Sequence, residues 1–92
     1  MVFKTGVLRL FMEKYTKKDL KVIGNRAIYR AKYNVLVDEW TLEVQTGSKE
    51  TYDLKIGMLF TTRNVERSFI SLETIQNFLS ECRVSAFIVL TH

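Results

Sequence analysis

Apolar and polar residues alternate along positions 26–44, RAIYRAKYNVLVDEWTLEV. The apolar or aromatic positions are Ala27, Tyr29, Ala31, Tyr33, Val35 and Val37, and the polar ones are Arg26, Arg30, Lys32 and Asn34. A period of two residues is typical of a strand with one packed face and one solvated face. The alternation restarts after Asp38 and Glu39, so the pattern predicts a second strand there.

A two-residue turn at Asp38-Glu39 places the apolar residues of both strands on one face. The predicted pairs are Val37 with Trp40, Val35 with Leu42, and Tyr33 with Val44. On the other face, Asn34 lies opposite Glu43 and Lys32 lies opposite Gln45. A register shifted by one residue would mix the two faces.

A short strand is predicted before this hairpin, over Leu20 to Ile23. Gly24-Asn25 is a suitable two-residue turn, since both residues tolerate positive φ. Pairing Ile23 with Arg26 then gathers the charged side chains of both strands on the solvated face. These residues are Lys21, Arg26, Arg30 and Lys32, with Ile28 among them.

A fourth strand is predicted after a three-residue loop at Gly47-Ser48-Lys49, and it extends to about Phe60. The predicted pairs are Val44 with Tyr52, Leu42 with Leu54, and Trp40 with Ile56, and Asp53 then lies opposite Glu43. Gly57 inside this strand suggests a bulge or a bend. Thr61 to Ser68 is predicted to be a loop.

Helical periodicity is found near both ends of the chain. Met1 to Tyr15 predicts an amphipathic helix, with a strand over Val7 to Met12 as the alternative. Ser71 is a suitable N-cap for a second helix, with Glu73 in its first turn. The apolar stripe of that helix is Leu72, Ile75, Phe78, Leu79 and Cys82. Val84 to Leu90 is apolar on both faces, which favours a buried final strand.

The elements together predict one α+β domain spanning residues 1–92. It contains a four-stranded antiparallel meander, an N-terminal helix, a C-terminal helix and a final buried strand, with both helices on one sheet face. The chain has one cysteine, no secretory signal pattern and no apolar run that could span a bilayer. We therefore expect a cytoplasmic protein without a membrane partner.

Charge is distributed unevenly, although the net charge is only +4. Seven basic residues lie between Lys14 and Lys32 with the single acid Asp19, whereas five acids lie between Asp38 and Asp53 with only Lys49. A basic region of this kind attracts nucleic acid or an acidic protein surface.

Our leading hypothesis is a small non-enzymatic module that binds nucleic acid through the basic sheet face. Phosphate contacts are assigned to Lys21, Arg26, Arg30 and Lys32, with Lys17 and Lys18 extending the surface. The alternative is a protein-binding adaptor or inhibitor of the compact kind that viruses and phages encode. Such a protein would dock an acidic partner, or a second copy of itself as a homodimer. No cofactor is expected.

The segment YNVLVDEWTLEVQTGSKE resembles the β-hairpin of restriction-endonuclease-like nucleases, which carries an aspartate followed by an acid-x-lysine triplet. The resemblance implies that Glu43 is a metal-binding acid, while Asn34 and Gln45 replace the aspartate and the lysine. A divalent-metal nuclease using Glu43 and Asp53 is therefore a third hypothesis. Cys82 is interpreted as a core residue, and His92 is the last residue of the chain.

Overall fold

The computed structural model describes residues 12–47, 50 and 53–90, and contains a six-stranded sheet and two α-helices. The elements in chain order are β1 (Met12–Tyr15), α2 (Lys17–Ile23), the 3₁₀ turn η1 (Gly24–Arg26), β2 (Ile28–Asn34), β3 (Glu39–Thr46), β4 (Lys55–Leu59), β5 (Ser68–Phe69), α3 (Leu72–Glu81) and β6 (Ile88–Leu90). Within the described part of the chain, no helix combines the length and apolar character needed to cross a bilayer.

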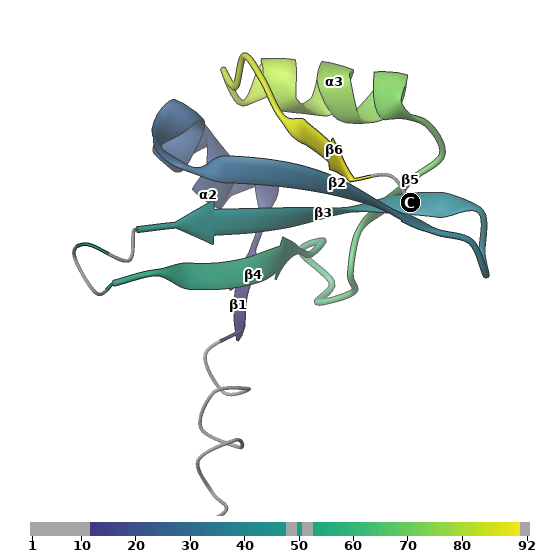
Figure 1. The fold of residues 1–92 in the computed structure, drawn as a ribbon, viewed down its shortest axis with the longest axis horizontal. Helices are drawn as coiled ribbons and strands as arrows, with labels where there is room; N and C mark the ends of the chain where they lie inside the picture. Colours follow the sequence, from purple (N-terminus) through teal and green to yellow (C-terminus); the bar gives the residue numbers. More distant parts are fainter. Residues whose placement is uncertain (1–11, 48–49, 51–52, 91–92) are drawn as a thin grey trace, which may run out of the picture.

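The sheet has the strand order β1-β4-β3-β2-β6, and β5 pairs with the end of β3 (Figure 1). The pairs β2–β3, β3–β4 and β3–β5 are antiparallel, whereas β1–β4 and β2–β6 are parallel. The predicted α+β class with a multi-stranded sheet is thus confirmed. The predicted all-antiparallel meander of four strands is wrong, because the two outer strands add to the sheet in parallel.

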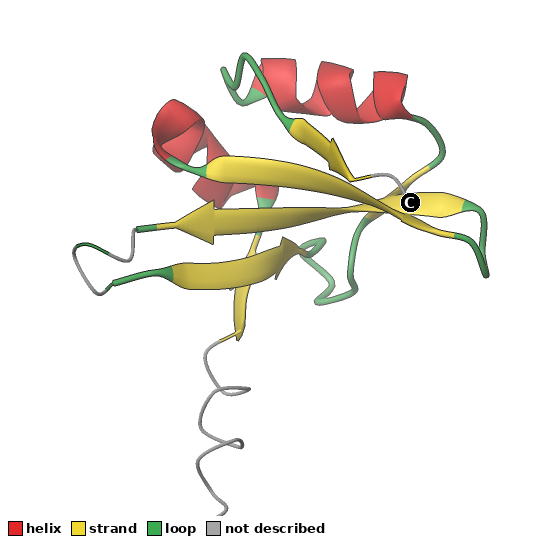
Figure 2. Ribbon diagram, in the orientation of Figure 1, coloured by secondary structure: helices red, strands yellow, loops and turns green. Residues whose placement is uncertain are grey.

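The core lies on one face of the sheet. Tyr29, Ala31, Leu42 and Val44 of β2 and β3 are at most 1% exposed. They form one cluster with Leu20 of α2 and with Ile75, Phe78 and Leu79 of α3. The two described helices therefore cover the same sheet face, and Figure 2 shows how they lie relative to the strands.

The central hairpin has a longer turn than its sequence predicts. Its loop is Val35–Asp38, and Tyr33 pairs with Trp40 instead of Val44. The Asn34 side chain accepts a hydrogen bond from the Leu36 N–H (3.0 Å), and Asp38 has φ 56°. Relative to the predicted register, the partner of each β2 residue is shifted along β3 by an even number of residues, so the same side chains stay on the core face. Val35 and Val37 lie in this loop and were predicted to pack on the core face, but they are 74% and 57% exposed.

The segment 20–23 is helical, so the predicted first strand of the meander is wrong. The carboxylate of Asp19 accepts hydrogen bonds from the backbone N–H and the hydroxyl of Thr16, at 2.9 and 3.2 Å. This Thr-x-x-Asp spacing is a helix-capping pattern, and α2 begins at Lys17, three residues before the predicted strand. Gly24 ends the helix with φ 57°. It was predicted to form a hairpin turn, but it forms a helix C-cap.

Tyr29 joins the sheet to the end of α2. Its hydroxyl donates to the backbone oxygen of Gly24 at 2.8 Å, and burial raises the pKa of Tyr29 to about 12. The side chain thus packs in the core while its polar atom is satisfied at the helix terminus.

The predicted N-terminal helix is wrong over the part that the structure describes. Met12 to Tyr15 forms β1, which pairs with β4 in parallel. Residues 1–11, which include most of the alternative strand Val7 to Met12, lie outside the described residues. The hydrogen-bonding groups of β4 that face away from β3 thus take β1 as a partner.

The register of β4 also differs from the prediction, and here the faces are inverted. Val44 lies opposite Gly57, and the shift from the predicted pairing is an odd number of residues. Ile56 therefore joins the solvated face, where it is 36% exposed. Gly57 lies in the regular ladder instead of a bulge. A Cβ there would lie 2.2 Å from the backbone oxygen of Glu13 in β1.

The other predicted pairs of β4 are wrong together with this register. Trp40 pairs with Phe69 of β5 instead of Ile56, and Leu42 has no pairing with Leu54. Tyr52 and the loop residues Ser48 and Lys49 lie outside the described residues. The predicted loop Thr61 to Ser68 is mostly correct, except that Ser68 begins β5.

The second helix is confirmed as α3, with Ser71 as its N-cap. The Ser71 hydroxyl accepts from the Thr74 N–H at 3.2 Å, and the predicted stripe residues Ile75, Phe78, Leu79 and Cys82 are buried. The final strand is shorter than predicted and is not buried on both faces. It lies at the sheet edge beside β2, where Ile88 is 47% exposed. An edge strand has one neighbour only, so apolar composition alone does not bury it.

The hairpin register can be tested with Leu42→Ala and Tyr33→Ala. Leu42 is fully buried, so its truncation should lower the free energy of unfolding by about 2–5 kcal/mol. Tyr33 is 42% exposed and packs against Trp40 with ring centroids 5.1 Å apart. Its truncation should therefore lower the free energy of unfolding by less, about 1 kcal/mol. Urea unfolding measures both. Equal losses would instead support the register with a two-residue turn.

The pairing of β1 with β4 can be tested with Gly57→Ala. The new methyl group would collide with the backbone of Glu13, so either β1 or β4 must move. We expect the free energy of unfolding to fall by about 1–3 kcal/mol, which is typical of overpacking. Urea unfolding measures this loss. If the variant is as stable as the parent, β1 does not lie against β4.

Candidate nucleic-acid interface

The six basic residues predicted to bind phosphate do not share one surface. Lys17, Lys18 and Lys21 lie on α2, and Arg26 lies in the 3₁₀ turn that follows it. Only Arg30 and Lys32 lie on the sheet. The prediction of a four-residue basic sheet face is therefore wrong, because the segment that carries Lys21 is a helix and not a strand.

A group of cations surrounds Glu81 at the C-terminal end of α3. Lys17 Nζ lies 2.5 Å from a carboxylate oxygen of Glu81. This hydrogen bond, together with the charges of Lys17, Lys21 and Arg67, lowers the pKa of the Glu81 carboxyl. Arg83 lines a cavity of about 310 Å³ together with Lys21, Glu81 and Cys82. We call Lys17, Lys21, Arg67 and Arg83 the helix-end cluster.

The helix-end cluster is held in place by packing as well as by charge. The Arg67 guanidinium lies 4.8 Å from the centroid of the Phe78 ring, and Lys17 Nζ lies 5.6 Å from the same centroid. Cations over an aromatic face are attracted to its π electrons. The Arg67 backbone is fixed by a hydrogen bond from its N–H to Leu59 O at 2.9 Å. Two of the four cations are thus positioned against the core.

The turn after α3 positions Arg83. Its φ is 64°, and its N–H donates to Ser80 O at 3.0 Å. The next residue, Val84, is buried and donates to Leu79 O at 2.9 Å. Sequence reasoning missed Arg67 and Arg83 as site residues, because each is more than forty residues from α2 along the chain. No local spacing could have joined them to the lysines.

Lys18 and Lys21 are the cations of α2 with unused hydrogen-bonding capacity. Both are exposed, and neither makes an ion pair or a hydrogen bond with any described residue. Asp19, the acid of α2, accepts a hydrogen bond from the Thr16 N–H at the start of the helix. The two ammonium groups are therefore available to an external anion.

The Arg26 side chain caps the C-terminal end of α2, the helix that precedes it. Its guanidinium donates to the backbone oxygens of Ile23 and Val22, at 3.2 and 2.7 Å. Carbonyl groups at a helix C-terminus have no partner within the helix and carry partial negative charge. The position of Arg26 is thus explained by capping, and we do not include it in the candidate interface.

The two basic residues on the sheet are paired with an acid. Arg30 Nη1 lies 2.9 Å from one Glu43 oxygen, and Lys32 Nζ lies 3.2 Å from the other. Arg30 also donates to the side-chain oxygen of Gln45. The predicted register places Glu43 opposite Asn34, but the longer hairpin loop places it directly opposite Arg30.

The arrangement expected of a metal-dependent nuclease is not formed. Glu43 lies opposite Met58 in β4 instead of Asp53, and Asn34 lies opposite Glu39. Gln45 lies opposite Ile28 instead of Lys32. Across residues 12–47, 50 and 53–90, no three acidic, histidine or cysteine side chains come together where they could hold a metal ion.

Cys82 is a core residue, as predicted. Its thiol is fully buried, and burial is the main cause that raises the pKa of this thiol. A thiol with a raised pKa is a poor nucleophile, since the thiolate is the reactive form. His92 lies outside the described residues.

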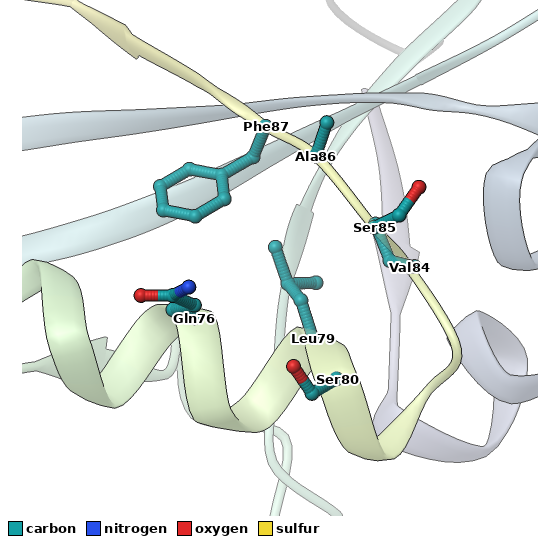
Figure 3. A pocket seen from close by; sticks show the side chains of 7 residues that line it. All are labelled: Gln76, Leu79, Ser80, Val84, Ser85, Ala86 and Phe87. Atoms are coloured by element: carbon teal, nitrogen blue, oxygen red, sulfur yellow. The ribbon is translucent and has the colours of Figure 1, made fainter.

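A separate hollow lies between α3 and the segment leading to β6 (Figure 3). Its volume is about 260 Å³, and its lining residues are Gln76, Leu79, Ser80, Val84, Ser85, Ala86 and Phe87. None of these side chains titrates, so the hollow has no group for acid–base catalysis and no charge to attract a phosphate.

Compared with protein-family models, with curated proteins and with solved structures, the chain has no significant match. The function proposed below therefore rests on the residues of this chain alone.

Proposed function

We propose that the protein is a small non-enzymatic module that binds nucleic acid through the helix-end cluster and the neighbouring Lys18. The observation that carries this proposal is that Lys17, Lys21 and Arg67 lie close enough to Glu81 to lower the pKa of its carboxyl, and that Arg83 lines a cavity beside it. The positive charge there exceeds the negative charge by three, before Lys18 is added. A local excess of this size is the electrostatic footprint expected of a phosphate-binding surface.

Glu81 supports phosphate binding by this cluster, although its negative charge lies among the cations. Glu81 holds Lys17 in one position, which reduces the conformational entropy that a phosphate contact would cost. Lys21 and Arg83 border the same cavity and have no direct ion pair with any described acid. A phosphate group placed there would meet two cations while Glu81 stays engaged with Lys17.

The sheet cations are less suited to this role. Arg30 is only 23% exposed, and its donors are directed to Glu43 and Gln45. A phosphate would have to displace these partners. We therefore assign the phosphate contacts to Lys17, Lys18 and Lys21 from the predicted set, and add Arg67 and Arg83.

The proposal can be tested with Lys21→Gln, using Lys55→Gln as a matched control. Both residues are exposed, and each variant removes one positive charge, but Lys55 lies on β4 and does not line the cavity that Lys21 and Arg83 border. Fluorescence anisotropy with single- and double-stranded DNA and RNA, over a series of salt concentrations, measures the affinity. The slope of log K against log salt should fall by about 1 for Lys21→Gln, and should stay unchanged for Lys55→Gln.

Two results would contradict the proposal. One is the absence of salt-dependent binding by the parent protein to any of the four nucleic acids. The other is an equal loss of affinity in Lys21→Gln and Lys55→Gln, which would mean that only net charge matters. A thermal melt of each variant establishes that folding is unchanged.

A further inference from the structure

Another cavity lies where the C-terminal end of α2 meets β1 and the ends of β3 and β4. Its volume is about 370 Å³. Its lining residues are Glu13, Tyr15, Ile23, Arg26, Thr46 and Lys55. None of them belongs to the helix-end cluster or lines the hollow beside α3. We call this cavity the corner cavity. Half of its lining residues carry a formal charge, and the proposed nucleic-acid contacts use none of them.

The strand register places three of these residues on the core face of the sheet. Thr46 follows the buried Val44 by two residues, and Lys55 lies directly opposite Thr46. Glu13 lies beside Gly57, which is itself opposite Val44. Side chains two residues apart in a strand, and those of directly paired residues, point to the same side of a sheet. The core face thus changes from apolar to polar at this end of the sheet.

Two groups of the corner cavity are held in place by other contacts. Tyr15 is 9% exposed, and its hydroxyl lies 3.2 Å from that of Thr46. The two hydroxyls share one hydrogen bond, so one O–H is left to donate. The two backbone contacts of Arg26 fix its guanidinium at the end of α2 and use two of its five N–H donors. Three donors are left for a ligand.

The opposite charges of the corner cavity are not paired with each other. Glu13, Arg26 and Lys55 take part in no ion pair with any described residue, so the carboxylate lies beyond ion-pair distance of both cations. The acid Asp53 is close to Gly47 in the loop between β3 and β4, and does not line the cavity. Unpaired charges that border one cavity each gain from a ligand group of opposite charge.

The kind of ligand follows from matching each charge. Glu13 requires an ammonium group, whereas Arg26 and Lys55 each require a carboxylate. A phosphate would be repelled by Glu13, and a metal ion would meet one carboxylate and two cations. A molecule with one ammonium and two carboxylates satisfies all three side chains. A cavity of about 370 Å³ lies within the size range of small-molecule sites.

We propose that the corner cavity binds an acidic α-amino acid, aspartate or glutamate. The ammonium group lies on Glu13, and the two carboxylates lie on Arg26 and Lys55. The free O–H of the Tyr15–Thr46 pair supplies a further donor to a carboxylate. This site is separate from the helix-end cluster, so either interaction can fail without the other.

NMR titration of the parent protein with L-glutamate and with L-aspartate, at constant pH and ionic strength, tests the proposal. One of them should produce saturable shifts in the amide signals of Glu13, Thr46 and Lys55. L-Glutamine lacks the second carboxylate, and glutarate lacks the ammonium group. Each should bind at least about tenfold more weakly than L-glutamate, because each leaves one charged side chain without its partner.

Two variants test the contacts. Glu13→Gln and Lys55→Gln each remove one charge from the cavity, and each should weaken binding of the acidic amino acid at least about tenfold. Arg63→Gln is the control, because Arg63 is exposed, carries a positive charge and does not line the cavity. It should leave the affinity unchanged. A thermal melt of each variant establishes that folding is retained, and if Glu13→Gln unfolds, the exposed Lys55 decides.

Four results would overturn the proposal. The first is the absence of saturable shifts with both amino acids at millimolar concentrations. The second is glutarate binding as tight as that of L-glutamate, which would mean that the ammonium group is not recognised. The third is parental affinity in the folded cavity variants. The fourth is an equal loss in Arg63→Gln and Lys55→Gln, because only net charge would then matter.

Discussion

The fold is organised by the burial of one face of the β2–β3 hairpin, and this constraint fixes the arrangement of the other elements. Tyr29, Ala31, Leu42 and Val44 are almost completely removed from water, and their alternation sets the direction of every other side chain in the two strands. β3 is the strand to which β2, β4 and β5 are all hydrogen-bonded. Both helices then pack on the same face, and Tyr29 bonds the end of α2 directly.

The same constraint separates two groups of charged residues. Since the core occupies one side of the sheet, the charged positions of the hairpin are left on the other side with Glu43 between them. The cations of α2 lie instead on the helical side, beside the end of α3. A chain that is simply basic in its first third thus carries one surface dominated by positive charge, and another on which charge is nearly balanced.

Short-range signals in the sequence were sufficient for some elements. The period of two identified the core face of β2 and β3, and the Ser71 cap with the apolar stripe identified α3. These features depend on neighbouring residues, because a strand alternates its side chains and a helix repeats every 3.6 residues. The Thr16–Asp19 cap was also a local signal, and recognising it would have shown that α2 is a helix.

Local sequence patterns were therefore enough to identify the packed face of the central hairpin, the helix α3 and the predominance of basic residues before residue 33. The loop length of that hairpin, the inverted face of β4 and the parallel addition of β1 and β6 depend on long-range contacts. The same contacts pair Glu43 with Arg30 and bring Arg67 and Arg83 to the lysines of α2. The physical reason is that register and strand order depend on contacts between residues far apart in the chain, where backbone pairing accepts many partners and only packing selects one.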